Sequence, residues 1–275
     1  MGKGKNNEEL FRSMPVAQAI LTLAVPTVVS QIITIIYNMA DTFFIGQLGD
    51  PKQVAAATLA MPLFMFMTAL SNLFGVGGAS LISRFLGGGE REKASRCGAF
   101  CIWTAAAVSV LYGLMVLAGR PVLLPVLGAN EETCDMASSY LFWTIGLGAL
   151  PTVMNPALAH LIRSEGYSRQ ASLGVAFGGI LNMVLDPLFI YGLHLQITGA
   201  AIATLISNAT AMIYFLAFIW KMRGVSVLTL SPGMYTLGEH IPAEVISVGM
   251  PSFLISMMGT VSNMVLNHII AGYSN

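Results

Sequence analysis

The polar residues of this chain are confined to short stretches that separate long apolar segments. Runs without a charged residue extend over positions 13–40, 54–83, 97–119, 136–162, 187–220 and 245–275. Each run exceeds the roughly 20 residues that a helix needs to cross a bilayer. The polar, turn-prone stretch from Gly192 to Gln196 divides the material between Gln170 and Trp220 into two helices, so the pattern predicts seven membrane-spanning helices.

The predicted fold class is therefore all-α, a polytopic membrane protein. We expect helices at residues 16–46, 54–86, 96–118, 136–161, 170–193, 198–221 and 245–271. Residues 1–223 would form a six-helix N-lobe, residues 224–244 a cytoplasmic interlobe loop, and residues 245–275 the first helix of a second lobe. The pattern disfavours an outer-membrane barrel, because the strands of a barrel would alternate apolar and polar residues over about ten positions, whereas these runs are continuously apolar.

Composition and charge placement agree with this assignment. Only 9% of the residues are charged and 55% are hydrophobic, against about 25% charged in a typical soluble domain. Of the 13 lysines and arginines, all but Lys52 and Arg120 fall on one side of the predicted membrane. The positive-inside rule then predicts a multi-pass protein of the cell inner membrane with a cytoplasmic N-terminus. No Lys or Arg is predicted to lie inside a helix away from its ends.

Asp41 and Asp186 are the only carboxylates inside the long apolar segments. An ionisable group within a bilayer costs roughly 2.5–3.5 kcal/mol on insertion scales, so it usually binds an ion, relays a proton or meets a substrate. Structural roles remain open for each residue. Asp41 could extend to the membrane surface, and Asp186 could satisfy backbone groups that are freed by Pro187.

Helix geometry places several further oxygen-bearing side chains beside these carboxylates. At a rise of about 1.5 Å per residue, Asp41, Asp186 and Thr204 lie at similar depths below the same membrane face. Asn182 and Tyr37 each precede an aspartate by four residues and share its helix face. Tyr140, from the fourth helix, is expected in the same layer. Interhelical hydrogen bonding is the alternative role for Asn182 and Thr204.

The predicted ligand set is made of hard oxygen donors. Such oxygens suit a proton or Na⁺ rather than a soft transition metal. Asp41 and Asp186 are therefore the candidate metal ligands if the ion is Na⁺. The sequence does not distinguish H⁺ from Na⁺, because the same oxygens serve both.

An internal repeat links the first and seventh helices. Pro26 matches Pro251, and Asn38 matches Asn263 at the same offset. The match predicts a parallel repeat of six helices, although chance similarity between apolar segments is an open alternative. The second lobe would begin just before the sequence stops, so we expect a truncated protein. Leu266 takes the place of Asp41 in the seventh helix, which would restrict the cation site to the N-lobe.

These residues resemble the multidrug and toxic compound extrusion (MATE) transporters. The resemblance rests on Pro26 through Gly49 in helix 1, on Asn182 to Ile190 in helix 5 and on Gly199 to Thr204 in helix 6. It implies twelve helices in two lobes and a bend of helix 1 at Pro26. The cation or proton-relay site that it implies contains Asp41, Asn182, Asp186 and Thr204, supported by Tyr37, Tyr140 and Ala200.

The expected function is H⁺- or Na⁺-coupled antiport that exports drugs or toxic organic compounds. The expected partners are a small organic, often cationic substrate, the lipid bilayer and the missing C-lobe. We expect no enzyme activity, no cofactor beyond the coupling ion and no nucleic-acid partner. The alternatives are a lipid-linked oligosaccharide flippase, which would need basic residues in its cavity, and a non-transporting fragment. A retinal receptor would need a lysine in the last helix, and an aspartyl protease a Gly-x-Gly-Asp signature; neither is present.

Overall fold

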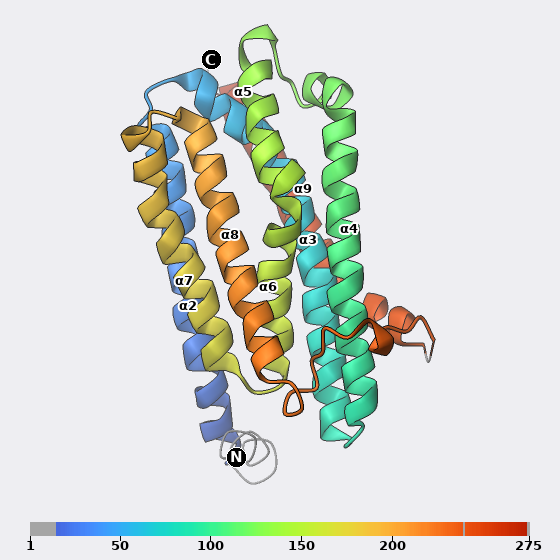
Figure 1. Cartoon of the computed structure of the whole chain (residues 1–275). Coiled ribbons are helices and arrows are strands. Elements are labelled where there is room, and N and C mark those ends of the chain that lie inside the picture. The colour runs from blue at the N-terminus through green and yellow to red at the C-terminus, as the bar shows by residue number, and fades with distance from the viewer. Residues whose placement is uncertain (1–14, 239, 274–275) are drawn as a thin grey trace.

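The chain folds into a bundle of long helices (Figure 1). The computed structural model describes residues 15–238 and 240–273, and for residues 260–273 it describes the backbone alone. The elements are α2 (Val16–Gly46), α3 (Pro51–Gly87), α4 (Arg91–Val126), α5 (Glu131–Leu141), η1 (Phe142–Leu147), α6 (Ala149–Ser164), α7 (Ser168–Pro187), η2 (Leu188–Gly192), α8 (Gln196–Lys221), η3 (Pro232–Met234) and α9 (Ile241–Tyr273).

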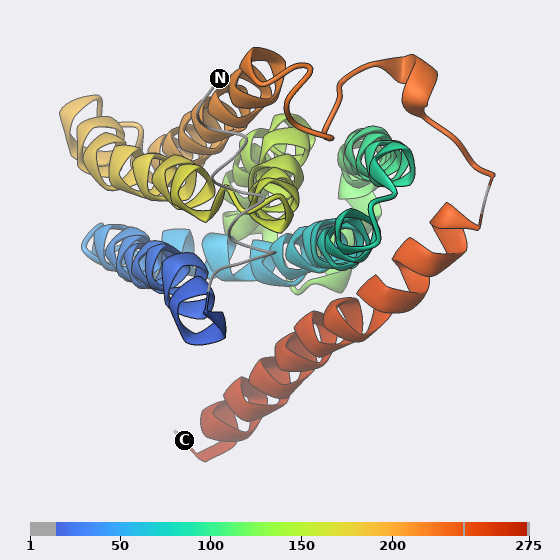
Figure 2. The same cartoon turned by 90° about the horizontal axis from the view of Figure 1, so that it is seen from below.

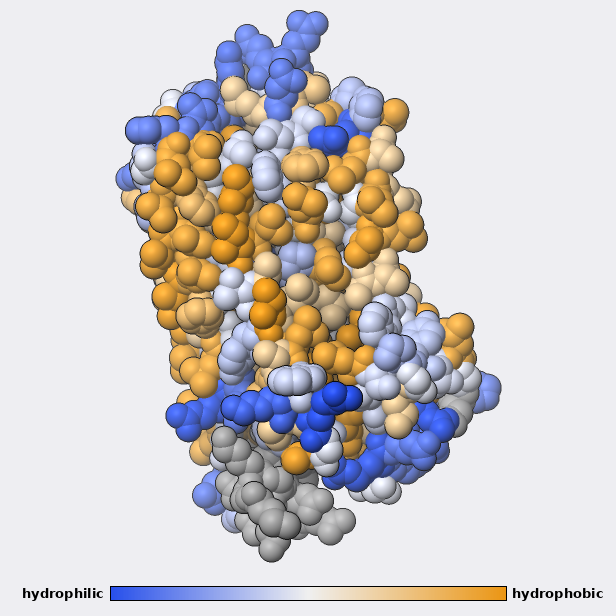
Figure 3. All heavy atoms as spheres, in the orientation of Figure 1, coloured by the Kyte–Doolittle hydropathy of each residue, from blue (hydrophilic) through white to orange (hydrophobic). Residues whose placement is uncertain are grey.

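The described part of the chain is that of a multi-pass membrane protein. Six of its helices are long and apolar enough to cross a bilayer, and the bent pair formed by residues 131–147 and 149–164 would be a seventh span. Hydrophobic side chains form a broad belt between hydrophilic residues at the two ends (Figure 3). The prediction of an all-α polytopic fold is therefore confirmed.

Several helices extend beyond the apolar runs that predicted them. The helix α3 begins at Pro51 rather than 54 because the Asp50 side chain accepts a hydrogen bond from the Lys52 amide at 3.0 Å, which caps the helix. Likewise, α5 begins at Glu131 rather than 136, where Asn130 and Thr133 form a capping box. Polar residues that stabilise a helix end are invisible to a search for apolar runs.

The same extension corrects the expectation that no Lys or Arg lies inside a helix. Arg120 lies within α4, which runs to Val126 rather than 118, and Arg163 lies in the last turn of α6. The Arg120 Nε donates to the Leu117 carbonyl and its Nη1 to the Ser138 hydroxyl, both at 3.2 Å. Arg120 is therefore held by its own helix and by α5.

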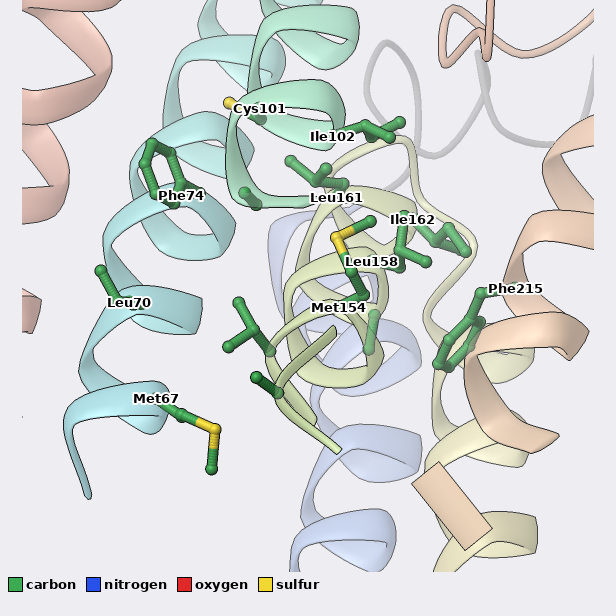
Figure 4. Close-up of a cluster of buried hydrophobic side chains, with 14 of the residues drawn as sticks. Met67, Leu70, Phe74, Cys101, Ile102, Met154, Leu158, Leu161, Ile162 and Phe215 are labelled. Carbon is green, nitrogen blue, oxygen red and sulfur yellow. The ribbon is translucent and has the colours of Figure 1, made fainter. Parts of the chain in front are cut away.

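The centre of the bundle is α6, which contacts α3, α4, α7 and α8. Its buried apolar residues meet those of its neighbours in one core cluster (Figure 4). On one side of this centre α2 pairs with α7, and on the other α9 packs along α3 (Figure 2). Residues from α2, α7 and α8 therefore come together away from α9.

The segment after α8, residues 222–238, crosses the end of the bundle where α2 begins and α8 ends (Figure 2). We call this end the basic end, because most of the Lys and Arg residues lie there, and the segment the linker. The Arg91 Nη2 donates to the Val225 carbonyl at 2.8 Å. Glu165 accepts hydrogen bonds from the Ser226 hydroxyl and the Leu228 amide, both at 2.8 Å. The first part of the predicted interlobe loop is thus attached to α4 and to the segment that follows α6.

Glu165 makes the stability of the folded chain dependent on pH. Burial raises the pKa of the Glu165 carboxyl, and its hydrogen bonds with the linker and the charge of Arg91 offset the rise only in part. A carboxyl whose pKa is higher in the folded than in the unfolded chain favours the folded state at acidic pH, and this contribution is lost as the pH rises through the raised value. We expect the unfolding temperature of the unmodified chain, relative to that of the Glu165→Gln variant, to fall as the pH rises from mildly acidic to alkaline.

The Glu165→Gln variant keeps a hydrogen-bond acceptor but does not titrate, so the comparison isolates the contribution of Glu165. Glu244→Gln, which alters an exposed carboxylate at the start of α9, should follow the unmodified chain at every pH. An unfolding temperature of the unmodified chain that rises with pH relative to Glu165→Gln would contradict the assignment.

Candidate cation-binding site

The predicted site residues come from three neighbouring elements of the bundle. Asn182 lies on α7, one turn before Asp186, and its Nδ2 donates to the Asp186 Oδ1 at 3.2 Å. The same Nδ2 donates to the Thr204 Oγ1 on α8 at 3.4 Å. Asn182 and Asp186 are buried, with exposed fractions of 3% and 0%. The structure therefore joins three of the four predicted ligands directly.

Asp41 reaches the same layer from α2. It lies close enough to Asp186 for the two carboxylates to interact electrostatically, and the buried hydroxyl of Tyr140 lies near both. Tyr37 packs one turn away from Asp41, against α7. A Cβ at Gly179 would lie 2.7 Å from the Tyr37 ring, so the glycine permits this approach of α2 to α7.

Buried oxygens of this layer are left without hydrogen-bond donors. Among the described residues, Asp41 Oδ1, Asn182 Oδ1 and Asp186 Oδ2 are buried and have no partner. An unsatisfied buried polar atom costs about 1–3 kcal/mol, and more when it is charged. Two carboxylate oxygens and an amide oxygen in one layer can hold a proton or a hard cation such as Na⁺, which prefers oxygen ligands.

The part of the chain that carries most of these residues matches a known protein family. The family model described as MatE matches residues 26–188, which include Asp41, Asn182 and Asp186. The chain belongs to the MatE family. The resemblance to the MATE transporters is thereby confirmed, although Thr204 lies outside the matched residues.

Individual relatives agree with the family assignment. The chain is 32% identical to the multidrug export protein MepA of Staphylococcus saprophyticus over 265 residues, which cover 96% of this chain and 58% of that protein. It is 30% identical, with the same coverage, to MepA of Staphylococcus aureus. This MatE chain thus spans less than two thirds of the length of these relatives.

Solved structures of transporters share the fold. A MATE crystal structure in complex with MaD3S aligns with a TM-score of 0.88 at 28% identity, covering 95% of this chain and 58% of that one. A MOP superfamily transporter from Pyrococcus furiosus, in which reverse polarity of the binding pocket suggests a different function, aligns at 28% identity with a TM-score of 0.86 and coverages of 95% and 57%.

Helix irregularities flank the carboxylates of this MatE chain. Tyr140 precedes the π-helical segment η1 within the fourth span, and Asp186 is followed by Pro187 and the π-helical segment η2. Such wide turns are frequent at functional sites. The Thr144 Oγ1 donates to the Tyr140 carbonyl at 2.7 Å, which satisfies part of the backbone at the first irregularity. Neither segment is visible in the apolar pattern of the sequence.

A small apolar cluster covers the site at the end of the bundle opposite the basic end. It is formed by the buried residues Ile45, Ile190 and Ala200. Above it the Tyr191 hydroxyl donates to the Phe44 carbonyl at 2.8 Å. Ala200, predicted as a supporting residue, is thus part of the cover over the carboxylates.

Gln53 extends this cover and was not among the predicted residues. Its Nε2 donates to the Gln196 Oε1 at 3.0 Å, and its Oε1 accepts from the Ile197 amide at 3.1 Å. Gln196 has a φ of 53°, which a non-glycine residue rarely adopts. Gln53 therefore fixes the strained start of α8, the helix that carries Thr204. A glutamine in the first turn of a helix is unremarkable in sequence, so no signal marked it.

Asn155 belongs to a separate, partly buried cluster. Its Nδ2 donates to the Asn208 Oδ1 at 2.8 Å, and the Asn208 Nδ2 donates to the Thr152 Oγ1 at 3.3 Å. These bonds join α6 to α8, and no hydrogen bond in the described chain connects them with the carboxylates. The sequence prediction also left Asn155 out of the cation site. Pro26 lies inside the continuous helix α2, and its role as a hinge stays a prediction.

Proposed function

We propose that this chain is the N-lobe, with the first helix of the second lobe, of an H⁺- or Na⁺-coupled antiporter that exports drugs or other toxic organic compounds. The observation that carries the proposal is the group of buried oxygens without donors on Asp41, Asn182 and Asp186. The relatives named multidrug export proteins support the exported class. The expected substrates are small organic molecules, often cationic.

The coupling step rests on competition for these oxygens. Two carboxylates that face each other in a low-dielectric interior repel unless a cation or a proton lies between them. A proton or Na⁺ that enters therefore draws α2 and α7 together, whereas its release lets them separate. Tyr37, packed against Gly179 on α7, would transmit this change to the apposed helices. Bending of α2 at Pro26 would then alter the side of α2 that faces the substrate.

Transport also needs the second lobe. The chain covers 58% of its MepA relatives, so the substrate cleft would lie between this lobe and the remaining helices. The basic end is assigned to the cytoplasm, because basic residues are retained on that side. We place the protein in the cell inner membrane on the same ground.

The flippase alternative would require basic side chains near the middle of the membrane. Arg120 and Arg163, whose positions inside helices were not predicted, lie toward opposite ends of the bundle instead. Arg120 is bound to Leu117 and Ser138, and Arg163 donates to the Ser30 hydroxyl at 3.4 Å. This placement favours the antiporter.

The decisive experiment is export driven by an imposed gradient. The protein and its second lobe are reconstituted in liposomes that contain a fluorescent cationic dye. A gradient that drives H⁺ into the liposomes, or one that drives Na⁺ into them, is then applied in separate reactions. One of the two gradients should accelerate dye movement, and an ionophore for that ion should abolish the effect. Dye movement that is independent of both gradients would overturn the proposal.

Thr204 offers a conservative test of the site itself. The Thr204→Val variant removes the hydroxyl that joins α8 to Asn182 but keeps the side-chain shape. We expect cation affinity to fall about fivefold, because one lost hydrogen bond contributes about 1 kcal/mol. The measurement is equilibrium binding of radioactive Na⁺, or of H⁺ by release on titration. Thr210→Val is the matched control, since the exposed Thr210 hydroxyl bonds only to the Ile206 carbonyl of its own helix. Equal effects of the two variants would argue against a role for Thr204.

A further inference from the structure

A second candidate binding site lies at the basic end, far along α8 from Thr204. It is a pocket of about 300 Å³ between the last turn of α8 and the linker. Its lining consists of Ile219, Trp220, Arg223, Leu230, Ser231 and Pro232. The volume is at the lower end of the range of small-molecule sites, which suits a headgroup better than a drug.

The pocket is lined by one positively charged side chain, Arg223. No hydrogen bond or ion pair joins the Arg223 guanidinium to another residue of the described chain. Lys221 adds a second exposed positive charge two residues earlier. The neighbouring buried carboxylate, Glu165, is occupied by the Ser226 hydroxyl and the Leu228 amide. The pocket therefore favours an anion, and the Ser231 hydroxyl can donate to it.

The remaining walls are apolar and continue onto the membrane-facing surface. Trp220 is 66% exposed on the final turn of a spanning helix, the depth at which tryptophan concentrates at membrane interfaces. Ile206, Ile213 and Trp220 are exposed at intervals of seven residues, so they share one face of α8. An acyl chain can follow this face directly into the pocket, and this distinguishes a lipid from a soluble anion.

We propose that this pocket binds the phosphate of an anionic phospholipid. Arg223 pairs with the phosphate oxygens, the Ser231 hydroxyl donates to the headgroup, and Trp220 packs along the glycerol backbone. The acyl chain extends past Ile213 on the outer face of α8. The bound lipid would join α8 to the linker, because the two walls of the pocket come from these two segments.

The test uses the whole chain in mild detergent. Native mass spectrometry measures the retention of added phosphatidylglycerol and phosphatidylcholine, and the unfolding temperature is followed in parallel. We expect preferential retention of phosphatidylglycerol with a rise in the unfolding temperature. Arg223→Gln should weaken phosphatidylglycerol binding about fivefold, as expected for the loss of one charge near an anionic lipid surface. Arg169→Gln, at an exposed arginine of the same end that does not line the pocket, should leave binding unchanged.

Competition by water-soluble ligands distinguishes a bound phospholipid from a bound soluble phosphate. Inorganic phosphate or glycerol 3-phosphate at millimolar concentration should not displace phosphatidylglycerol, because neither can follow the apolar face of α8. Displacement by either would overturn the lipid assignment in favour of a soluble anion. Equal retention of the two lipids, or equal losses in Arg223→Gln and Arg169→Gln, would also overturn it.

Discussion

Replacing Asp186 by asparagine is expected to lower cation affinity roughly 100-fold, because a hydrogen bond to a charged group contributes up to about 3 kcal/mol. Asp186 is fully buried and is hydrogen-bonded to Asn182. The amide is nearly the same size, so the helices should still pack while the negative charge that attracts the cation is lost. Equilibrium binding of Na⁺ or H⁺ to the purified chain measures the change without requiring the second lobe.

Asp135→Asn provides the matched control. Asp135 is an exposed carboxylate on α5, the helix that also carries Tyr140. Loss of the Asp135 charge should change cation affinity less than about twofold, because salt screens a charge at the surface. Binding that survives in Asp186→Asn and fails in Asp135→Asn would place the cation elsewhere. The unfolding temperature of both variants should be measured, so that lost binding is not confused with lost folding.

Substituting alanine for Gly249 is expected to separate α9 from α3. A Cβ at this position would lie 2.1 Å from the Leu73 carbonyl oxygen, and the facing glycine, Gly77, would place a Cβ 2.5 Å from the Val245 carbonyl oxygen. These contacts are with backbone, which cannot move aside as a flexible side chain can. We expect a loss of about 1–3 kcal/mol of stability, observed as a lower unfolding temperature.

Gly259→Ala is the control on the same helix, because a Cβ there meets nothing within 4 Å. Alanine favours helix by about 1 kcal/mol over glycine, so this variant should be neutral or more stable. Disulfide crosslinking in the double variant Asn72→Cys, Ser256→Cys gives a second measurement, since Asn72 donates to the Ser256 hydroxyl at 2.9 Å across the interface. Unchanged crosslinking on adding Gly249→Ala would contradict the predicted separation.

The sequence predicted which candidate residues lie close together more accurately than it predicted the helix ends. Asn182 and Asp186 share a face because they are four residues apart, and helical periodicity alone predicts this. The bond from Asn182 to Thr204 required only that α7 and α8 be antiparallel neighbours. Tyr140 lies nine residues from the start of α5 rather than four, because the helix begins at Glu131, yet it still lies near both carboxylates.

Other features could not be predicted because they depend on tertiary contacts. Gln53 bonds to Gln196 and to the Ile197 amide, and both lie more than 140 positions further along the chain. The attachment of the linker to Glu165 likewise joins segments that show no local pattern. The predicted correspondence of Leu266 with Asp41, and of Asn263 with Asn38, lies outside the side chains that the structure describes.

In the proposed two-lobe transporter, the attachment of the linker would limit how far the lobes can separate at the basic end. Tyr235 is anchored by its stacking on Phe100 of α4, with ring centroids 6.0 Å apart, and α9 begins at Ile241. Even a fully extended chain advances at most about 3.6 Å per residue, so the start of α9 can lie no more than roughly 20 Å from this anchor. The linker is thus a short tether, and in the proposed transporter its length would limit the opening of a cleft between the lobes on that side.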